Sequence, residues 1–348
     1  MTRRAKLLVL ILGLVVVVGG GLLAGAWLVR ELSQPPLDYQ AGPGVGEVTV
    51  VVEQGQDLTQ VGRNLSDLGV VLTVEGFIKA SLRNPNSTQV TPGTYVLPRQ
   101  ITSDRAIELL LDPASKRTNQ VVIPEGLRLS RVIELLAEQT GIEKTKFEAA
   151  VAKAPSLGLP KWANGNPEGF LFPATYTFDE GQSAESMIKA MIERFNQAAS
   201  ETNLIEGASA RGYTPYEMVV IASLLEGEGQ PEHFGKVARV IENRFEQGMP
   251  LQFDSTVNYG LGTSEISLTQ SQLDTNTPYN SYLNPGLPPT PIGSPGEAAL
   301  RAALDPPPGD WLYFVTVDPD TGETRFSKSY QEFLRNKAIF TEWLKKNQ

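Results

Sequence analysis

The sequence predicts an α+β protein with an N-terminal transmembrane helix, a small α/β module and a larger C-terminal α+β domain. Three observations lead to this fold class: an uncharged stretch at residues 7–29, a strand–glycine–helix pattern that occurs twice in the first half, and several helical patterns with few strands in the second half. We expect the following segments: a cytoplasmic tail (1–6), the membrane helix (7–29), a linker (30–47), the small module (48–112), a second α/β module with connecting helices (113–205) and the C-terminal domain (206–348).

Composition and charge restrict the kind of function. The chain has 348 residues and a formal net charge of −9, which argues against a nucleic-acid partner held through phosphate contacts. It contains no cysteine and a single histidine, His233, so thiolate and multi-histidine metal sites are excluded. The sequence also lacks a P-loop, a dinucleotide-binding glycine motif and the G-x-S-x-G elbow of serine hydrolases. We therefore expect neither a metal nor a cofactor, and chemistry that rests on carboxylates.

Residues 7–29 are long enough to cross a bilayer, because a helix of this length extends over roughly 34 Å. Three basic residues precede the stretch, whereas Arg30 is followed by Glu31. This asymmetry places the N-terminus in the cytoplasm and the bulk of the chain outside the inner membrane. The alternative is a cleaved signal peptide that ends at the Ala-Gly-Ala run of residues 24–26. The length of the apolar stretch favours an uncleaved anchor.

The small module begins with a strand (47–53), a glycine turn and two amphipathic helices, and continues with a strand within 91–100 and a helix from Ser103. Its first part is echoed 71 residues later, where VVIPEGLRLSRVIELL resembles VVVEQGQDLTQVGRNL and Gly126 matches Gly55. Two copies do not make a solenoid, and strand–turn–helix is a generic pattern. We interpret the copies as two small α/β modules, of which the first resembles the glycan-binding LysM fold.

The second half contains most of the polar residues that we consider for a site. Aromatic residues gather within 159–178; they could stack on sugar rings, although such a cluster more often belongs to a core. Helices are expected from Ala184 and over 234–248. The next stretch, 249–262, is expected to be extended, and its hydrogen-bonding groups suit either sugar hydroxyls or a well-satisfied turn: Gln252, Asp254, Thr256, Asn258 and Tyr259. The chain then continues with a stiff proline-rich loop (277–296), a helix (297–304), a strand (311–317) and a last helix (329–345).

The C-terminal half is organised around residues 214–228, TPYEMVVIASLLEGE. The stretch opens with a threonine that can cap a helix, a proline suited to the first helical position and Glu217, which completes a capping box. The apolar run that follows is broken only by Ser223, which predicts a buried helix. It ends on Glu226 and Glu228, and the glycine after each acid is expected to stop the helix. Glu226 lies on the small-residue face, where a ligand has room and burial would raise the pKa of a general acid; alternatively, both acids point into water.

Seven motifs occur in order over the second half: PEGFLFPATY, IASLLEGE, VARVIENRF, LQFDSTVNYG, TPYNSY, GLPPTPIGSPG and WLYFVT. On these motifs, the chain from about residue 48 to its end resembles the MltG-type endolytic murein transglycosylases, the YceG-like family. The resemblance implies a membrane anchor, a LysM-like module and a C-terminal catalytic domain. The chain departs from the family pattern at Gly227, where lysine is common, and at 332–334, where Glu-Phe-Leu replaces Glu-His-Asn.

The resemblance implies non-hydrolytic cleavage of the β-1,4 bond between N-acetylmuramic acid and N-acetylglucosamine in nascent peptidoglycan, which gives 1,6-anhydro ends and terminates strand elongation. It implies Glu226 as the catalytic acid, Glu228 as a positioning acid, and Gln252 and Asp254 as substrate-site residues. The expected partners are glycan strands and, from the location at the membrane, peptidoglycan synthases. Two alternatives stay open: a hydrolase that pairs Glu226 with Asp254 or Glu228, and a non-catalytic, membrane-tethered peptidoglycan-binding scaffold.

Overall fold

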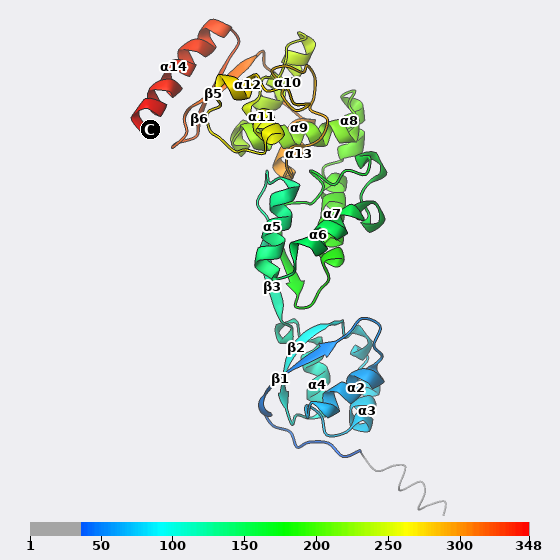
Figure 1. Cartoon of the computed structure of the whole chain (residues 1–348). Helices are drawn as coiled ribbons and strands as arrows, with labels where there is room; N and C mark the ends of the chain where they lie inside the picture. Colours follow the sequence, from blue (N-terminus) through cyan, green and yellow to red (C-terminus); the bar gives the residue numbers. More distant parts are fainter. Residues whose placement is uncertain (1–35, 348) are drawn as a thin grey trace, which may run out of the picture. The chain divides into compact units, whose positions relative to one another are not determined.

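The computed structural model describes residues 36–347 and separates into two compact units (Figure 1). Unit 1 comprises the described residues up to Arg117 together with Asp179–Gly181, and unit 2 comprises Thr118–Phe178 and the residues from Gln182 onwards. The membrane helix predicted at 7–29 lies outside the described residues. Within residues 36–347, no helix has both the length and the apolar character that crossing a membrane requires.

Unit 1 consists of one antiparallel pair of strands covered by helices. Its elements are β1 (Val45–Val52), α2 (Leu58–Asp67), α3 (Val74–Arg83), β2 (Gly93–Arg99) and α4 (Ser103–Leu111), with 3-10 turns at Ser87–Gln89 and Pro113–Ser115. In the strand pair, Val50 lies opposite Tyr95. Both side chains are buried with Leu65 of α2 and Phe77 of α3, so the helices close one small core over the strands. Every strand and helix predicted for the small module is present.

The two copies of the repeated pattern have the predicted strand–turn–helix form. Gly55, between β1 and α2, has φ +85°. Gly126, between β3 (Thr118–Val122) and α5 (Leu129–Thr140), has φ +74°. Glycine suits both turns because an L side chain would be strained at these angles.

Unit 2 is mainly helical. In addition to β3 and α5 its elements are α6 (Lys144–Ala152), β4 (Thr175–Asp179), α7 (Ala184–Glu201), α8 (Leu204–Ala210), α9 (Pro215–Glu228), α10 (Phe234–Glu246), α11 (Asp254–Leu261), α12 (Gln270–Leu273), α13 (Glu297–Leu304), β5 (Tyr313–Asp318), β6 (Glu323–Ser327) and α14 (Tyr330–Asn347). Strand β3 pairs with β4, and β5 pairs with β6 in an antiparallel hairpin. Strand β6 and the short helices α8 and α12 carry too little apolar periodicity to be predicted from sequence.

One hydrophobic core extends through unit 2, from β3 to α13. The aromatic cluster at 159–178 contributes to it: Phe170 is fully buried, and its ring centroid lies 4.7 Å from that of Phe195 in α7. Core packing, the more common role of such a cluster, is confirmed. Because segments 113–205 and 206–348 share this core, the predicted boundary at 205 does not separate two domains; the apolar faces of their helices cover each other.

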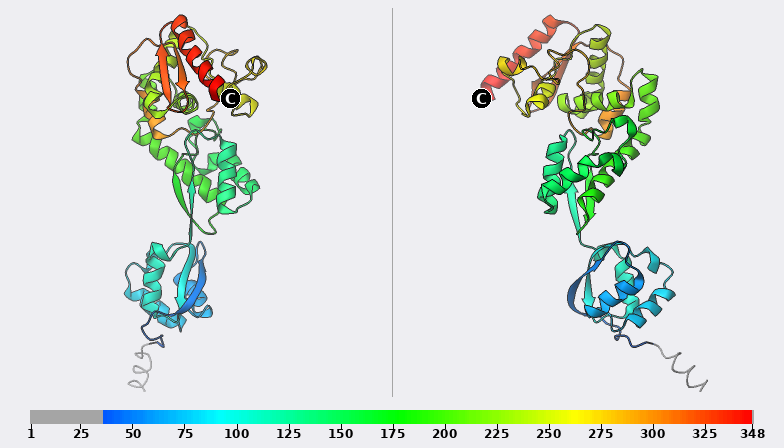
Figure 2. Two further views of the ribbon diagram at one scale, coloured as in Figure 1. Left: turned by 90° about the vertical axis from the view of Figure 1, so that its left-hand side faces the viewer. Right: turned by 45° about the vertical axis from the view of Figure 1, so that its right-hand side comes forward.

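Helix α9 lies among the other helices of this region. It contacts α8, α10, α11 and α13, which surround its apolar run (Figure 1). Figure 2 shows the same group of helices from two further sides. A helix that is apolar on all sides must be surrounded by other elements. Because the neighbouring helices bury the apolar run of α9, polar groups can be accessible only at its two ends.

Candidate active site

The start of α9 has the features predicted from sequence. The hydroxyl of Thr214 accepts a hydrogen bond from the backbone N–H of Glu217, and the carboxylate of Glu217 accepts one from the backbone N–H of Thr214. From Met218 to Leu225 every residue is buried. The capped, buried run therefore fixes where its last two acids emerge.

The glycine between the two acids does not stop the helix, contrary to the prediction: Gly227 is helical. A Cβ at this position would lie 3.0 Å from the Cβ of Ser255, so the absence of a side chain lets α11 approach α9 closely. Gly229 caps the helix, but in an extended conformation with φ −144°, not in the left-handed conformation that is common for glycine at helix ends.

Glu226 is bound by the proline-rich loop. Its Oε1 accepts a hydrogen bond from the backbone N–H of Gly296 at 2.9 Å. A Cβ at Gly126 would lie 3.5 Å from the Cβ of Glu226, so the turn of the second repeat copy is also adjacent. Burial raises the pKa of Glu226 to about 7; the Gly296 N–H opposes this shift, and the negative charge of Glu125 adds to it. A carboxyl group with this pKa can both give and take a proton near pH 7.

The loop that binds Glu226 is held by α9 and by the turn after β3. The hydroxyl of Ser223 accepts a hydrogen bond from the backbone N–H of Ile292 at 3.0 Å. Ser294 exchanges two backbone hydrogen bonds of 2.8 Å with Gly126–Leu127. A Cβ at Gly293 would lie 2.4 Å from the carbonyl oxygen of Gly126, a distance that only glycine permits. These contacts fix the position of the Gly296 amide, which binds the carboxyl group of Glu226.

Glu228 is directed toward α11. Its Oε1 accepts a hydrogen bond from the backbone N–H of Ser255 at 3.1 Å, in the first turn of α11, where negative charge is favourable. Burial raises the pKa of Glu228 to about 7; hydrogen bonding from Ser255 opposes this, and the charge of Asp254 adds to it. Asp254 accepts a hydrogen bond of 2.6 Å from the phenol of Tyr282. The two acids thus have similar pKa values but different surroundings: Glu228 binds the first turn of α11, and Glu226 binds the loop residue that precedes α13.

Three of the other polar residues predicted for the site use their side chains inside the protein, and the fourth, Gln252, does not. Thr256 and Asn258 are buried and bind backbone groups of neighbouring residues. Tyr259 donates a hydrogen bond of 2.8 Å to Glu168, whose other oxygen accepts from the first amide of α5. Gln252 is exposed, with φ +53°. The structure therefore connects Ser223 with Glu226 through the proline-rich loop, and Glu228 with Asp254 through the first turn of α11. A role of the others in sugar binding stays a prediction.

The stretch 249–262 is not extended as predicted, because a helix begins at Asp254. Alternating polar residues suggest a strand, but local features favour a helix here. The positive φ of Gln252 turns the chain, Phe253 has an extended conformation, and an acid in the first turn suits the helix dipole.

Sequence reasoning missed two residues beside Glu226. Gly296 supplies the amide that binds it, and Glu125 is the charged neighbour that raises its pKa. A signal for Glu125 is present in the repeat, because the first copy has Gln54 at the matching position. Of the two matching turns, only the one at Gly126 is preceded by an acid.

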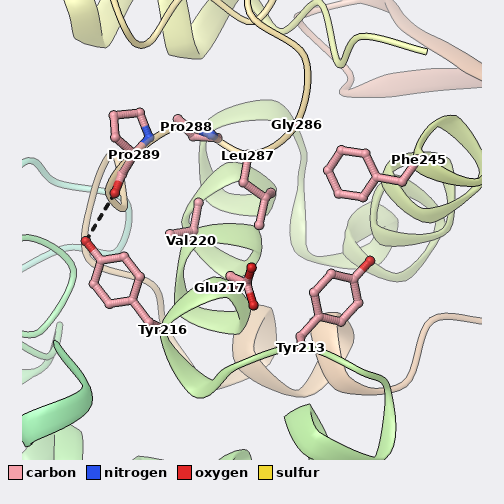
Figure 3. A pocket seen from close by; sticks show the side chains of 9 residues that line it. All are labelled: Tyr213, Tyr216, Glu217, Val220, Phe245, Gly286, Leu287, Pro288 and Pro289. Atoms are coloured by element: carbon pink, nitrogen blue, oxygen red, sulfur yellow. Dashed lines mark hydrogen bonds between the residues drawn. The ribbon is translucent and has the colours of Figure 1, made fainter. Parts of the chain in front are cut away.

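A pocket of about 390 Å³ opens at the other end of α9 (Figure 3). Aromatic, aliphatic and proline side chains line it, with one carboxylate: Tyr213, Tyr216, Glu217, Val220, Phe245, Gly286, Leu287, Pro288 and Pro289. The phenol of Tyr216 donates a hydrogen bond of 3.4 Å to the carbonyl of Pro289 at its edge. Glu217 and Glu226 are nine residues apart in α9, which is about 14 Å along the axis. This pocket is therefore separate from the surroundings of Glu226.

Fold and site together define an α+β protein with a partly buried carboxyl group of raised pKa at the end of a buried helix. A family model described as the YceG-like family matches residues 50–339. The crystal structure of a yceG-like protein from Listeria monocytogenes superimposes with a TM-score of 0.55 at 27% sequence identity and covers 84% of this chain and 99% of its own. The chain belongs to the YceG-like family.

Curated relatives carry a functional name. The endolytic murein transglycosylase of Bacillus subtilis is 28% identical over 333 residues, which cover 91% of this chain and 90% of the relative. The endolytic murein transglycosylase of Streptococcus pneumoniae (serotype 2) is 31% identical over 326 residues. The match covers 84% of this chain but 58% of that relative, so the pneumococcal protein contains a large part without a counterpart here.

Proposed function

We propose that this chain is an endolytic murein transglycosylase, a lyase that cleaves the β-1,4 bond between N-acetylmuramic acid and N-acetylglucosamine and leaves 1,6-anhydro ends. The observation that carries the proposal is the carboxyl group of Glu226, which has a pKa of about 7 and is held by one backbone amide at the end of a buried helix. The names of the Bacillus and Streptococcus relatives support the same activity.

One carboxyl group can perform both proton transfers of this reaction. Protonated Glu226 gives its proton to the glycosidic oxygen while the bond from that oxygen to C1 breaks. The carboxylate then takes the proton of the C6 hydroxyl as the C6 oxygen bonds to C1 and closes the anhydro ring. No water is consumed, and Glu226 ends protonated, as it began. The nucleophile belongs to the same sugar, so its attack is favoured entropically and needs no strong separate base.

The neighbouring polar groups would hold the geometry. Glu228 would act as a positioning acid, because it binds the first turn of α11 and so fixes Asp254 on that helix. Asp254 and the exposed Gln252 would contact sugar hydroxyls. In addition, we propose that residues 7–29 anchor the chain in the inner membrane, that the LysM-like module 48–112 binds glycan, and that the enzyme terminates nascent strands beside peptidoglycan synthases.

The mass of the products tests the proposal. Full-length protein in detergent is incubated with purified glycan strands, and the products are compared with those of Glu226→Gln. We expect anhydro ends, which lack one water, from the wild type and none from the variant. Reducing ends would instead indicate the hydrolase with two carboxylates, and an absence of cleavage by the wild type would indicate the non-catalytic scaffold.

A further inference from the structure

The turn after β3 places a second carboxylate beside the loop that binds Glu226. A Cβ at Gly296 would lie 1.8 Å from Oε1 of Glu125 and 2.3 Å from its carboxyl carbon, so this carboxylate lies directly against the Cα of Gly296. The N–H of the same glycine donates to Glu226. From Oε1 of Glu125 it is 1.8 Å to the position of that Cβ, about 1.5 Å on to the Cα of Gly296, about 1.46 Å to its nitrogen, and 2.9 Å to Oε1 of Glu226. These two oxygens can therefore be no more than about 8 Å apart.

The comparison of the repeat copies indicates that this acid is not required by the turn. The matching residue in the first copy is Gln54, and the turns at Gly55 and Gly126 have similar positive φ angles of +85° and +74°. Nothing lies within 4 Å of a Cβ at Gly55, whereas Gly126 lies against Glu226. The acid is therefore present in the copy of the turn that touches α9 and absent from the other.

We propose that Glu125 is a second catalytic carboxylate, which faces the anomeric carbon across Gly296 and stabilises the positive charge that develops there while Glu226 transfers the protons. This inference rests on the proposed transglycosylase activity and adds a residue to it. The side chain of Glu125 is exposed, as a group that meets a substrate must be. It makes no covalent bond in this role, so the proton and bond balance of the reaction is unchanged.

The separation of the two carboxyl groups is compatible with these two roles, proton transfer by Glu226 and charge stabilisation by Glu125. Two-carboxylate glycosidases place their acids about 5–9.5 Å apart, on either side of the anomeric centre. The upper limit of about 8 Å set by the contacts with Gly296 does not exceed this range. Removing one oxyanion-hole donor, a group that stabilises charge in the transition state, costs about 10²–10³ in kcat, and we expect an effect of the same order for a carboxylate beside a developing cation.

The charges around Glu226 allow a clear test. Within residues 36–347, Glu125 is the charged side chain that acts on Glu226. Asp254 of α11 and Arg244 of α10 act instead on Glu228, the other acid of α9. Removing the charge of Glu125 therefore changes the field at Glu226 without removing another of its charged neighbours.

The experiment measures kcat, KM and their pH dependence on glycan strands for full-length Glu125→Gln. We expect kcat to fall about 10²- to 10³-fold with KM changed less than threefold. The alkaline limb of the pH profile should move to lower pH, because the pKa of Glu226 is no longer raised by the neighbouring charge. Glu125→Asp should restore part of the rate. The matched control is Glu148→Gln, an exposed acid on α6, which should behave as the wild type.

A second variant moves the carboxylate without removing it. Gly296 has φ −80°, which alanine also adopts, and the atoms that a Cβ would meet are the end of the flexible Glu125 side chain. Gly296→Ala should therefore fold, keep the amide bound to Glu226 and lower kcat by displacing Glu125. Normal kcat and an unchanged pH profile in Glu125→Gln would overturn the inference while leaving the transglycosylase activity intact. A wild type that forms no anhydro ends would overturn both.

Discussion

Replacing Glu226 with glutamine should strongly lower activity and, at alkaline pH, stabilise the protein. The pKa of Glu226 is raised from 4.5 to about 7 on folding, so the unfolded chain releases this proton before the folded protein does. The folded state is therefore progressively disfavoured as the pH rises from 4.5 through 7. One pKa unit corresponds to about 1.4 kcal/mol, which gives an upper value of about 3 kcal/mol above pH 8. Glu226 is only partly buried, and solvent screening reduces this to about 1–2 kcal/mol. Glutamine has no charge to bury.

The assay is urea unfolding of wild type and Glu226→Gln at pH 4.5, 7 and 9, followed by tryptophan fluorescence. The tryptophans of the described residues, Trp162, Trp311 and Trp343, all lie in unit 2 with the site. We expect nearly equal stability at pH 4.5 and an advantage for the variant that grows toward pH 9. Activity on glycan should fall by about 10²- to 10⁴-fold. A stability difference that does not change with pH, or a variant with normal turnover, would refute the reasoning.

Three further predictions concern Glu228, Ser223 and the small module. Glu228→Gln should lower activity less than Glu226→Gln, because Glu228 acts through α11; the reverse order in kcat would exchange the two roles. Ser223→Ala removes the acceptor of the buried Ile292 N–H and should cost about 1–3 kcal/mol in unfolding free energy, whereas the exposed Ser209→Ala should cost almost nothing. Deletion of residues 48–112 should weaken binding to long glycan strands while unit 2 keeps its fluorescence transition; unchanged binding would make the module a spacer.

Much of the local structure was predictable because its signals are local. The N-terminal end of α9 is determined by three neighbouring residues, and its burial by an unbroken apolar run. The two strand–turn–helix copies were equally predictable from sequence, because the glycine of the turn and the apolar period of 3.6 residues in the helix both lie within one short segment. Of the site, these local signals could predict only the position of Glu226 at the end of a buried helix.

The remainder of the site depends on contacts between distant segments. Nothing in the residues around Gly296 indicates that its amide binds α9, and nothing around Glu125 indicates which helix its turn will touch. The helical state of Gly227 likewise depends on the closeness of Ser255. In α11 the alternating polar pattern gave the wrong period, because those side chains bind neighbouring backbone groups within the protein and do not lie on one exposed face of a strand.

The energetics of Glu226 distinguish a chemical role from a structural one. A structural acid is expected to stabilise the fold when ionised, through a cation or the amides of a helix N-terminus. Glu226 accepts a hydrogen bond from one amide of this kind, the N–H of Gly296 at the start of α13. It also lies at the C-terminal end of α9, where the helix dipole opposes negative charge, and it is partly buried beside the negative charge of Glu125. The dipole, the burial and the neighbouring charge each make the ionised form costly at neutral pH. Glutamine would keep the shape without that cost, so the stability of the fold does not explain the acid. A carboxyl group that can give and recover a proton near pH 7 is what the proposed transglycosylase reaction requires.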